Sequence, residues 1–260
     1  MKVTKEKITP LVAEWMLKKN TGNRPVNKNH VKVLAREMIH GRWKSNGDTI
    51  CLNENQIIDG QHRLLAVIES GVTIETLLVS GLDSDVFDTK DVGKRRSAAD
   101  TLAVKGEMSC KSLAACLAVI DRYMTGRISK SVKYTNTEVE EVLEKYPEAR
   151  RSVRLCMETK RLLPNAILAG CHYLFAQKNQ EQADQFVRDL RSGVGLEDGD
   201  PVYVLRERLM QNNIAKAKLG KFYLMAIVIK AWNYRRDRKN IRFLRWREEG
   251  DNPEPFPVVI

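Results

Sequence analysis

The chain has 260 residues and lacks any long apolar run. Its longest apolar stretch, roughly 222–231, has charge at both ends and is shorter than the roughly 20 residues that span a bilayer. The first residues, MKVTKEKITP, contain no apolar stretch after their lysines, so they do not have the pattern of a secretory signal. These absences predict a cytoplasmic protein with no membrane partner.

Cysteine, glycine and proline are also sparse. The five cysteines are odd in number, form no Cys-x-x-Cys pair and lie in apolar contexts such as LAACLAVI, which argues against a zinc site or a disulfide framework. The 15 glycines and 8 prolines are spread thinly, which excludes collagenous and low-complexity chains. With 43% hydrophobic and 30% charged residues, the chain has the composition of a globular protein with its own core. We expect no metal site.

Positive charge, in contrast, is plentiful and unevenly placed. Residues 216–247 carry 11 basic and one acidic residue, which is nearly all of the net charge of +11. This segment interleaves its cations with aromatic residues, a composition suited to phosphate contacts and base stacking. The candidate nucleic-acid-binding residues are Arg235, Arg236, Arg238, Lys239, Arg242, Arg245 and Arg247. Two alternatives remain open: a helix with core aromatics and a solvated charged face, and a surface for acidic lipid or protein.

The first 105 residues predict a small unit of helices and strands. Thr9 and Pro10 are typical of a helix start, Asn27 is a good cap for a second helix, and Gly41 is a typical helix end. In chain order we expect a helix from 10 to near 22, a helix at 28–40, strands at 48–53 and 56–58, a helix at 61–70 and a strand at 72–79.

The turn between the second strand and the third helix is a candidate anion site. Backbone N–H groups at a helix start lack internal partners, and the helix dipole is positive there. Gly60 lets the backbone approach a ligand closely, Gln61 begins the helix, and His62 and Arg63 add polar groups to its first turn. Asp-Gly before a helix is also an ordinary turn, so the motif alone does not decide between the two interpretations.

A second set of cations stands before another predicted helix. Lys94, Arg95 and Arg96 come immediately before Ser97, a good helix cap, and together they form a second candidate phosphate site. The alternative is that the aspartates within 83–91 neutralise them in a solvated loop. Those aspartates lack the glycine and terminal glutamate of a calcium loop.

From residue 109 onward the pattern is helical throughout. We expect helices at 109–125, 137–146, 147–162, 164–178, 180–191, 201–218 and 220–236, with a capping box from Thr137 to Glu140. The predicted fold class is therefore α+β, with an α/β domain at 1–105 and an all-helical domain at 106–260 that ends in the basic segment.

The segment from residue 23 to 82 resembles the N-terminal domain of the ParB/sulfiredoxin superfamily. The likeness rests on NRPVNKNHVKVLAREM and IIDGQHRLLAVIESGV followed by a strand. It implies that the turn from Asp59 to Arg63 binds nucleotide phosphates, with Arg24 near the nucleotide and ATP or CTP with magnesium as cofactor. Gln61 stands where a sulfiredoxin has its nucleophile, which excludes that activity.

The whole chain also resembles a group of phage and prophage proteins. The shared stretches are FDTKDVGKRRSAADTL and AWNYRRDRKNIRFLRWR. This resemblance implies no activity, but together with the basic segment it leads us to expect a DNA-binding phage or prophage protein, with regulation by nucleotide and a homodimer left open. One alternative is a kinase-like phosphotransferase or a nuclease, in which Asp59 or Asp48 binds magnesium or acts as base and His62 moves a proton. The other is a host-interaction protein without catalysis.

Overall fold

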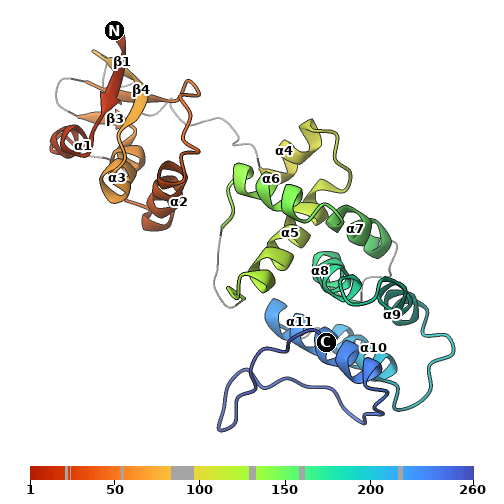
Figure 1. The fold of residues 1–260 in the computed structure, drawn as a ribbon. Helices are drawn as coiled ribbons and strands as arrows, with labels where there is room; N and C mark the ends of the chain where they lie inside the picture. The colour runs from red at the N-terminus through yellow and green to blue at the C-terminus, as the bar shows by residue number, and fades with distance from the viewer. Residues whose placement is uncertain are drawn as a thin grey trace. The chain divides into compact units, whose positions relative to one another are not determined.

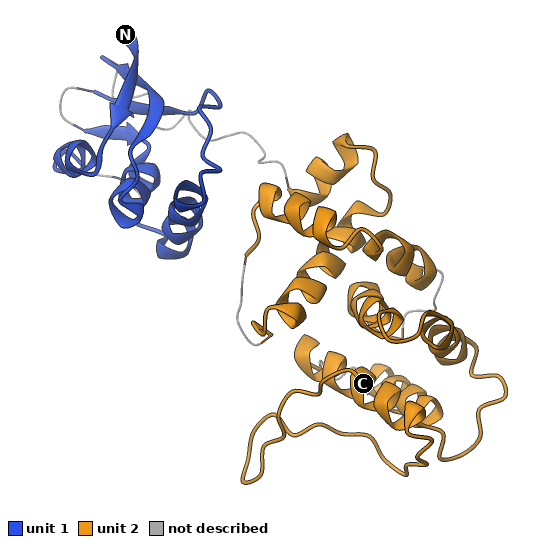
Figure 2. Cartoon of the chain, in the orientation of Figure 1, with its two compact units in different colours: residues 1–95 blue, residues 96–260 orange. Residues whose placement is uncertain are grey.

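The computed structural model divides the chain into two compact units, residues 1–95 and 96–260 (Figure 2). It describes residues 1–20, 23, 25–53, 56–82, 97–128, 133–157, 162–215 and 219–260. Within these ranges it contains 11 helices and a four-stranded sheet, which confirms the predicted mixture of helix and strand. The division falls before the expected boundary at 105/106 because helix α4 (Ala98–Val104) packs against the helices that follow it. None of the described helices has the length and apolarity to cross a membrane.

The first unit is built on one mixed sheet. Its strands are β1 (Lys2–Ile8), β2 (Thr49–Leu52), β3 (Ile57–Asp59) and β4 (Ile74–Ser80), in the spatial order β1-β4-β2-β3. Strand β4 pairs antiparallel with β1 and parallel with β2, and β2 pairs antiparallel with β3. The chain leaves β3 through a single glycine and enters helix α3, so the candidate turn lies at the edge of the sheet.

Three helices cover one face of this sheet: α1 (Pro10–Leu17), α2 (Lys28–Ile39) and α3 (Gln61–Ser70) (Figure 1). Their starts agree with the predicted caps, since the Thr9 side chain accepts a hydrogen bond from the Val12 N–H and that of Asn27 accepts one from the His30 N–H. The sheet contributes Ile8, Ile50, Ile57 and Ile74 to the shared core. Apolar residues at helical and strand periods thus meet in one layered core.

The second unit is helical, as expected. After α4 come α5 (Cys110–Met124), α6 (Asn136–Lys145), α7 (Ala149–Met157), α8 (Asn165–Ala176), α9 (Gln180–Ser192), α10 (Pro201–Ile214) and α11 (Lys221–Arg236). Helix α8 is buried over most of its length and packs against α5, α7, α9 and α11. Beside it, the Trp232 ring of α11 stacks on Phe175 with centroids 4.3 Å apart, and Phe186 meets both edge to face.

Residues 237–260 contain no regular secondary structure and pack back on the helices (Figure 1). The Trp232 indole donates to the Ile260 carbonyl at 3.0 Å, and the Val259 N–H donates to the Tyr123 hydroxyl at 2.8 Å. The buried side chains Leu244, Trp246 and Val259 join the helical core. The end of the chain is therefore an integral part of the second unit.

Candidate functional site

The backbone conformation and packing at the centre of the candidate turn require the glycine at position 60. Its φ of 107° is one that residues with a side chain rarely adopt, and a Cβ atom there would come within 3.1 Å of Cγ1 of Ile50. The packing of the turn against strand β2 therefore explains the glycine at this position by itself, and no ligand is needed to account for it.

The next two side chains point into the protein. Gln61 is 4% exposed and accepts a hydrogen bond from the Asn20 amide at 3.3 Å. His62 is 7% exposed, and its Nε2 accepts the backbone N–H of Asn27, the cap of α2, at 3.0 Å. In this arrangement both side chains join α3 to the segment before α2.

Arg63 and Asp59 are brought together, as both were expected to lie at the site. The Arg63 guanidinium donates to Asp59 Oδ2 at 3.0 Å and to the Thr49 carbonyl, and both side chains are largely buried. The N-cap of α3 is Gly60, which has no side chain to cap the helix start, where the helix dipole is positive. The nucleotide and catalytic roles of Asp59, Gly60, Gln61, His62 and Arg63 stay predictions.

Three residues of the second predicted phosphate site, Lys94, Arg95 and Arg96, lie outside the described residues. Arg24, predicted to lie near the nucleotide, does so too. Ser97 is described, and it caps α4 as expected. Its hydroxyl accepts the Asp100 N–H at 3.2 Å and lies 2.7 Å from Asp100 Oδ2, while its own N–H donates to that carboxylate. This reciprocal capping box accounts for Ser97 as a helix start.

Four of the seven candidate nucleic-acid-binding cations have partners within the protein. Three form ion pairs: Arg235 with Asp189 at 2.5 Å, Lys239 with Asp237 at 2.9 Å and Arg247 with Glu254 at 3.3 Å. Arg236 donates to the Ile260 carbonyl at 2.8 Å and lies over the Trp232 ring. Arg235 is the most enclosed of the four, and its pair joins α11 to α9.

The other three cations, Arg238, Arg242 and Arg245, are exposed. No carboxylate in the described part of the chain lies within ion-pairing distance of them. They belong to residues 238–247, which carry five basic and no acidic residues and which we call the arginine loop. Phe243, within this loop, is 68% exposed, and the Arg245 guanidinium lies 5.4 Å from its ring centroid.

Three other aromatic residues of the basic segment, Trp232, Tyr234 and Trp246, belong to the core or pack against it. Trp232 is 1% exposed and Trp246 is 8% exposed, and Trp246 packs edge to face on Phe256. Tyr234 is partly buried against the same core. The alternative of core aromatics is therefore correct for these three residues, whereas Phe243 is exposed.

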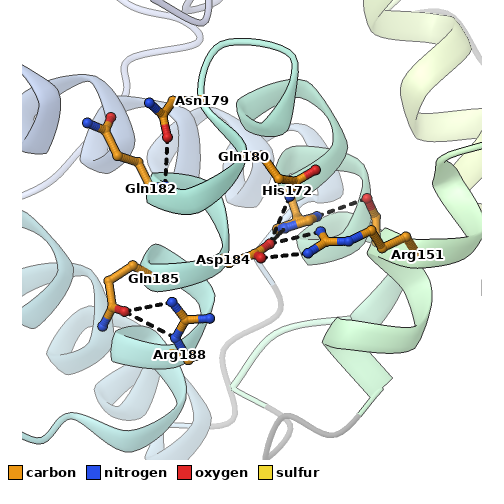
Figure 3. A network of polar contacts seen from close by, with 9 residues as sticks. Arg151, His172, Asn179, Gln180, Gln182, Asp184, Gln185 and Arg188 are labelled. Carbon is orange, nitrogen blue, oxygen red and sulfur yellow. Dashed lines mark hydrogen bonds and ion pairs between the residues drawn. The ribbon is translucent and has the colours of Figure 1, made fainter.

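A polar network that the sequence did not reveal joins helices α7, α8 and α9 (Figure 3). His172 lies between Ser152 and Asp184, with Nδ1 2.9 Å from the serine Oγ and Nε2 2.9 Å from Asp184 Oδ1. Arg151 adds a two-pronged ion pair to Asp184 at 2.6 and 2.9 Å, and Gln180 donates to the same carboxylate. The members come from three helices, with Arg151 and Ser152 on α7, His172 on α8, and Gln180 and Asp184 on α9, so no single local spacing marks the whole set in the sequence.

This network has the residue types of a serine hydrolase but not the accessibility. Ser152 is 2% exposed and His172 is fully buried, so a substrate carbonyl has no approach to the hydroxyl. Burial lowers the pKa of His172 despite the opposing effect of Asp184, and the Arg151 guanidinium holds the pKa of Asp184 far below its usual range. We assign the network to joining three helices through satisfied buried polar groups.

The described residues contain no cluster of three or more histidine, cysteine or acidic side chains suited to a metal ion. In comparisons with known proteins, no family model, curated protein or solved structure matches the chain. Functional inference therefore rests on the chemistry of its own residues.

Proposed function

We propose that the protein binds DNA through the arginine loop. The observation that carries the proposal is the concentration of Arg238, Arg242 and Arg245 within a short exposed segment, with no carboxylate partner among the described residues. Unpaired guanidinium groups that lie close together are suited to phosphate oxygens, which they contact with two parallel N–H groups. Their positive potential also attracts a polyanion over a longer range.

The backbone of Arg238 gives independent support. Helix α11 ends in a Schellman motif, in which the Lys239 N–H donates to the Tyr234 carbonyl and the Arg238 N–H to that of Arg235. The residue at this position must be left-handed, and Arg238 has a φ of 53°. Helices α2, α4 and α5 end in the same motif with Gly41, Gly106 and Gly126. A left-handed arginine costs about 1–2 kcal/mol relative to glycine, so a role of its side chain would explain its presence.

The resemblance to the ParB/sulfiredoxin superfamily adds a second part to the proposal, nucleotide binding at the start of α3. Its support is the start of α3, where the N-cap Gly60 has no side chain and the helix dipole is positive. Titration calorimetry with ATP and with CTP, each with magnesium, tests this part. Heat of binding that is lost in Arg63→Gln, in a variant that still folds, would support it. No heat with either nucleotide would remove it and leave DNA binding unaffected.

The DNA proposal is tested by fluorescence anisotropy of the full chain with a labelled duplex and a labelled single strand at several salt concentrations. The variant Arg238→Ala/Arg242→Ala/Arg245→Ala should bind the duplex more weakly. Its plot of log affinity against log salt should be shallower by about 2–3, because each duplex phosphate contact contributes about 0.9 to the slope.

A matched control removes the same charge elsewhere. Lys111, Lys178 and Arg208 are exposed cations of the second unit, and none of them pairs with an acidic group in the part of the chain that the structure describes. Their triple alanine variant should retain most of the affinity and slope of the wild type. Equal loss in both triple variants would mean that net charge alone attracts DNA, and absence of binding at low salt would overturn the proposal.

A further inference from the structure

The arginine loop has two chemically distinct faces. From Phe243 to Arg247 the residues alternate between exposed and buried: Leu244 and Trp246 enter the core, whereas Phe243, Arg245 and Arg247 face solvent. Alternation at a period of two is typical of extended backbone with one face packed. The outward face thus presents an aromatic ring and guanidinium groups side by side.

This face is held by fixed contacts on both sides. The Ile241 N–H donates to the Gly199 carbonyl at 2.9 Å, and the Glu254 N–H donates to the Arg247 carbonyl at 2.8 Å. Between them, the Trp246 indole donates to the Glu254 and Pro255 carbonyls at 3.2 Å. A ligand that bound here would meet a ring already positioned, with little loss of loop entropy.

Phe243 is unusual for its exposure. Among the described aromatic residues, only Phe243 and Trp15 fall in the exposed class, and Trp15 belongs to the other unit. Phe243 is flanked by two of the unpaired arginines, and the Arg245 guanidinium lies over its ring. A flat aromatic and guanidinium surface next to free cations is suited to a ligand that has both a planar ring and a phosphate.

We infer that the arginine loop binds single-stranded DNA in preference to duplex, with a base stacked on Phe243 and phosphates on Arg242 and Arg245. This inference rests on the proposed function and specifies the form of DNA. In a duplex the bases stack on one another and expose only their edges, so Phe243 finds no ring face there. In a single strand every base offers one.

The test compares an oligothymidylate, the same backbone without bases, and a duplex, each binding to the full chain. Phe243→Ala should weaken oligothymidylate binding about 10-fold, with the salt slope unchanged, because stacking on an aromatic side chain is not ionic. Duplex and abasic binding should change less than about twofold, since phosphate contacts dominate there. Phe243→Trp should restore binding, and its fluorescence should be quenched by the oligothymidylate.

The control Val258→Ala shortens another exposed apolar side chain after α11 and should leave all three affinities unchanged. If the duplex binds and Phe243→Ala binds oligothymidylate as the wild type does, this inference fails while the proposed function stands. If no DNA binds at low salt, the proposed function fails first. Equal affinity of the wild type for abasic and base-bearing strands would also overturn the inference.

Discussion

The turn from Asp59 to Arg63 and the arginine loop are both candidate phosphate sites in the sequence, but the fold largely buries the side chains of the first and exposes most of those of the second. In the turn, Gln61 and His62 are buried, and Arg63 is bound to Asp59. In the loop, three arginines and a phenylalanine face solvent without a carboxylate among the described residues to hold them. The comparison teaches that tertiary packing decides which side chains of a candidate site are held by the protein itself and which remain exposed to a ligand.

Gly60→Ala should have the largest effect on stability. We expect a loss of about 3 kcal/mol, because the new Cβ meets Ile50 and the backbone is left-handed. Gly71→Ala, at the other end of α3, is the matched control, since its φ of 68° is also left-handed but its Cβ would meet nothing within 4 Å. It should lose only about 1 kcal/mol. Urea unfolding measures both, and equal losses would contradict the packing explanation for Gly60.

Acid should weaken the second unit through His172. Its pKa is lowered in the fold, so the unfolded chain takes up the proton first, and stability falls as the pH drops below the ordinary value of 6.5. Asp184, whose pKa is also lowered, adds a loss only below its ordinary value of 3.8. His172→Gln cannot take up that proton. It should be less stable than the wild type at pH 7 by about 1–3 kcal/mol, but its stability should change less with pH just below pH 6.5. If the stability of this variant fell with acid as steeply as that of the wild type, a neutral His172 in the folded protein would be contradicted.

Replacement by alanine of two arginines near the end of the chain, Arg235 and Arg245, should affect stability and DNA binding differently. Arg235→Ala leaves Asp189 without its ion-pair partner in a largely buried position and should cost about 1–3 kcal/mol of stability. Arg245→Ala removes an exposed side chain and should change stability by less than about 0.5 kcal/mol, while it weakens DNA binding. Thermal unfolding and anisotropy of both variants compare the two roles. Equal effects on stability would remove the distinction between paired and unpaired cations.

Arg238→Gly should change stability in the opposite direction. Glycine relieves the left-handed strain at the end of α11, so we expect stabilisation of about 1 kcal/mol. The same variant loses one phosphate contact and should bind duplex DNA with a salt slope shallower by about 0.9. A more stable protein with unchanged DNA binding would leave the arginine at this position without the proposed role.

Local signals in the sequence predicted most of the helices but missed one strand. The predicted starts at Pro10 and Pro201 are confirmed, because a capping side chain and a fixed φ act within a few residues. Strand β1, in contrast, reads KVTKEKI and buries only Ile8, so it carries no clear apolar alternation. Its pairing with β4, more than sixty residues later, makes it a strand.

The start of α6 shows how tertiary contacts decide between two equal local signals. The sequence contains Thr-x-x-Glu twice, and we expected the capping box at Thr137 and Glu140. That expectation is wrong: Thr135 and Glu138 form the box. The preceding Tyr134 hydroxyl donates to Asp121 at 2.7 Å, which fixes the chain one residue before Thr135 and favours the earlier start.

The sequence alone determined the helical periods, most caps, the mixed fold class and the concentration of cations before residue 248. These depend on neighbours along the chain and on composition, which need no folding to be seen. The tertiary structure decided which cations are neutralised, that Trp232 and Trp246 are core, and that Ser152, His172 and Asp184 meet. Each of these depends on side chains from separate elements, whose distances are set only when the apolar faces pack.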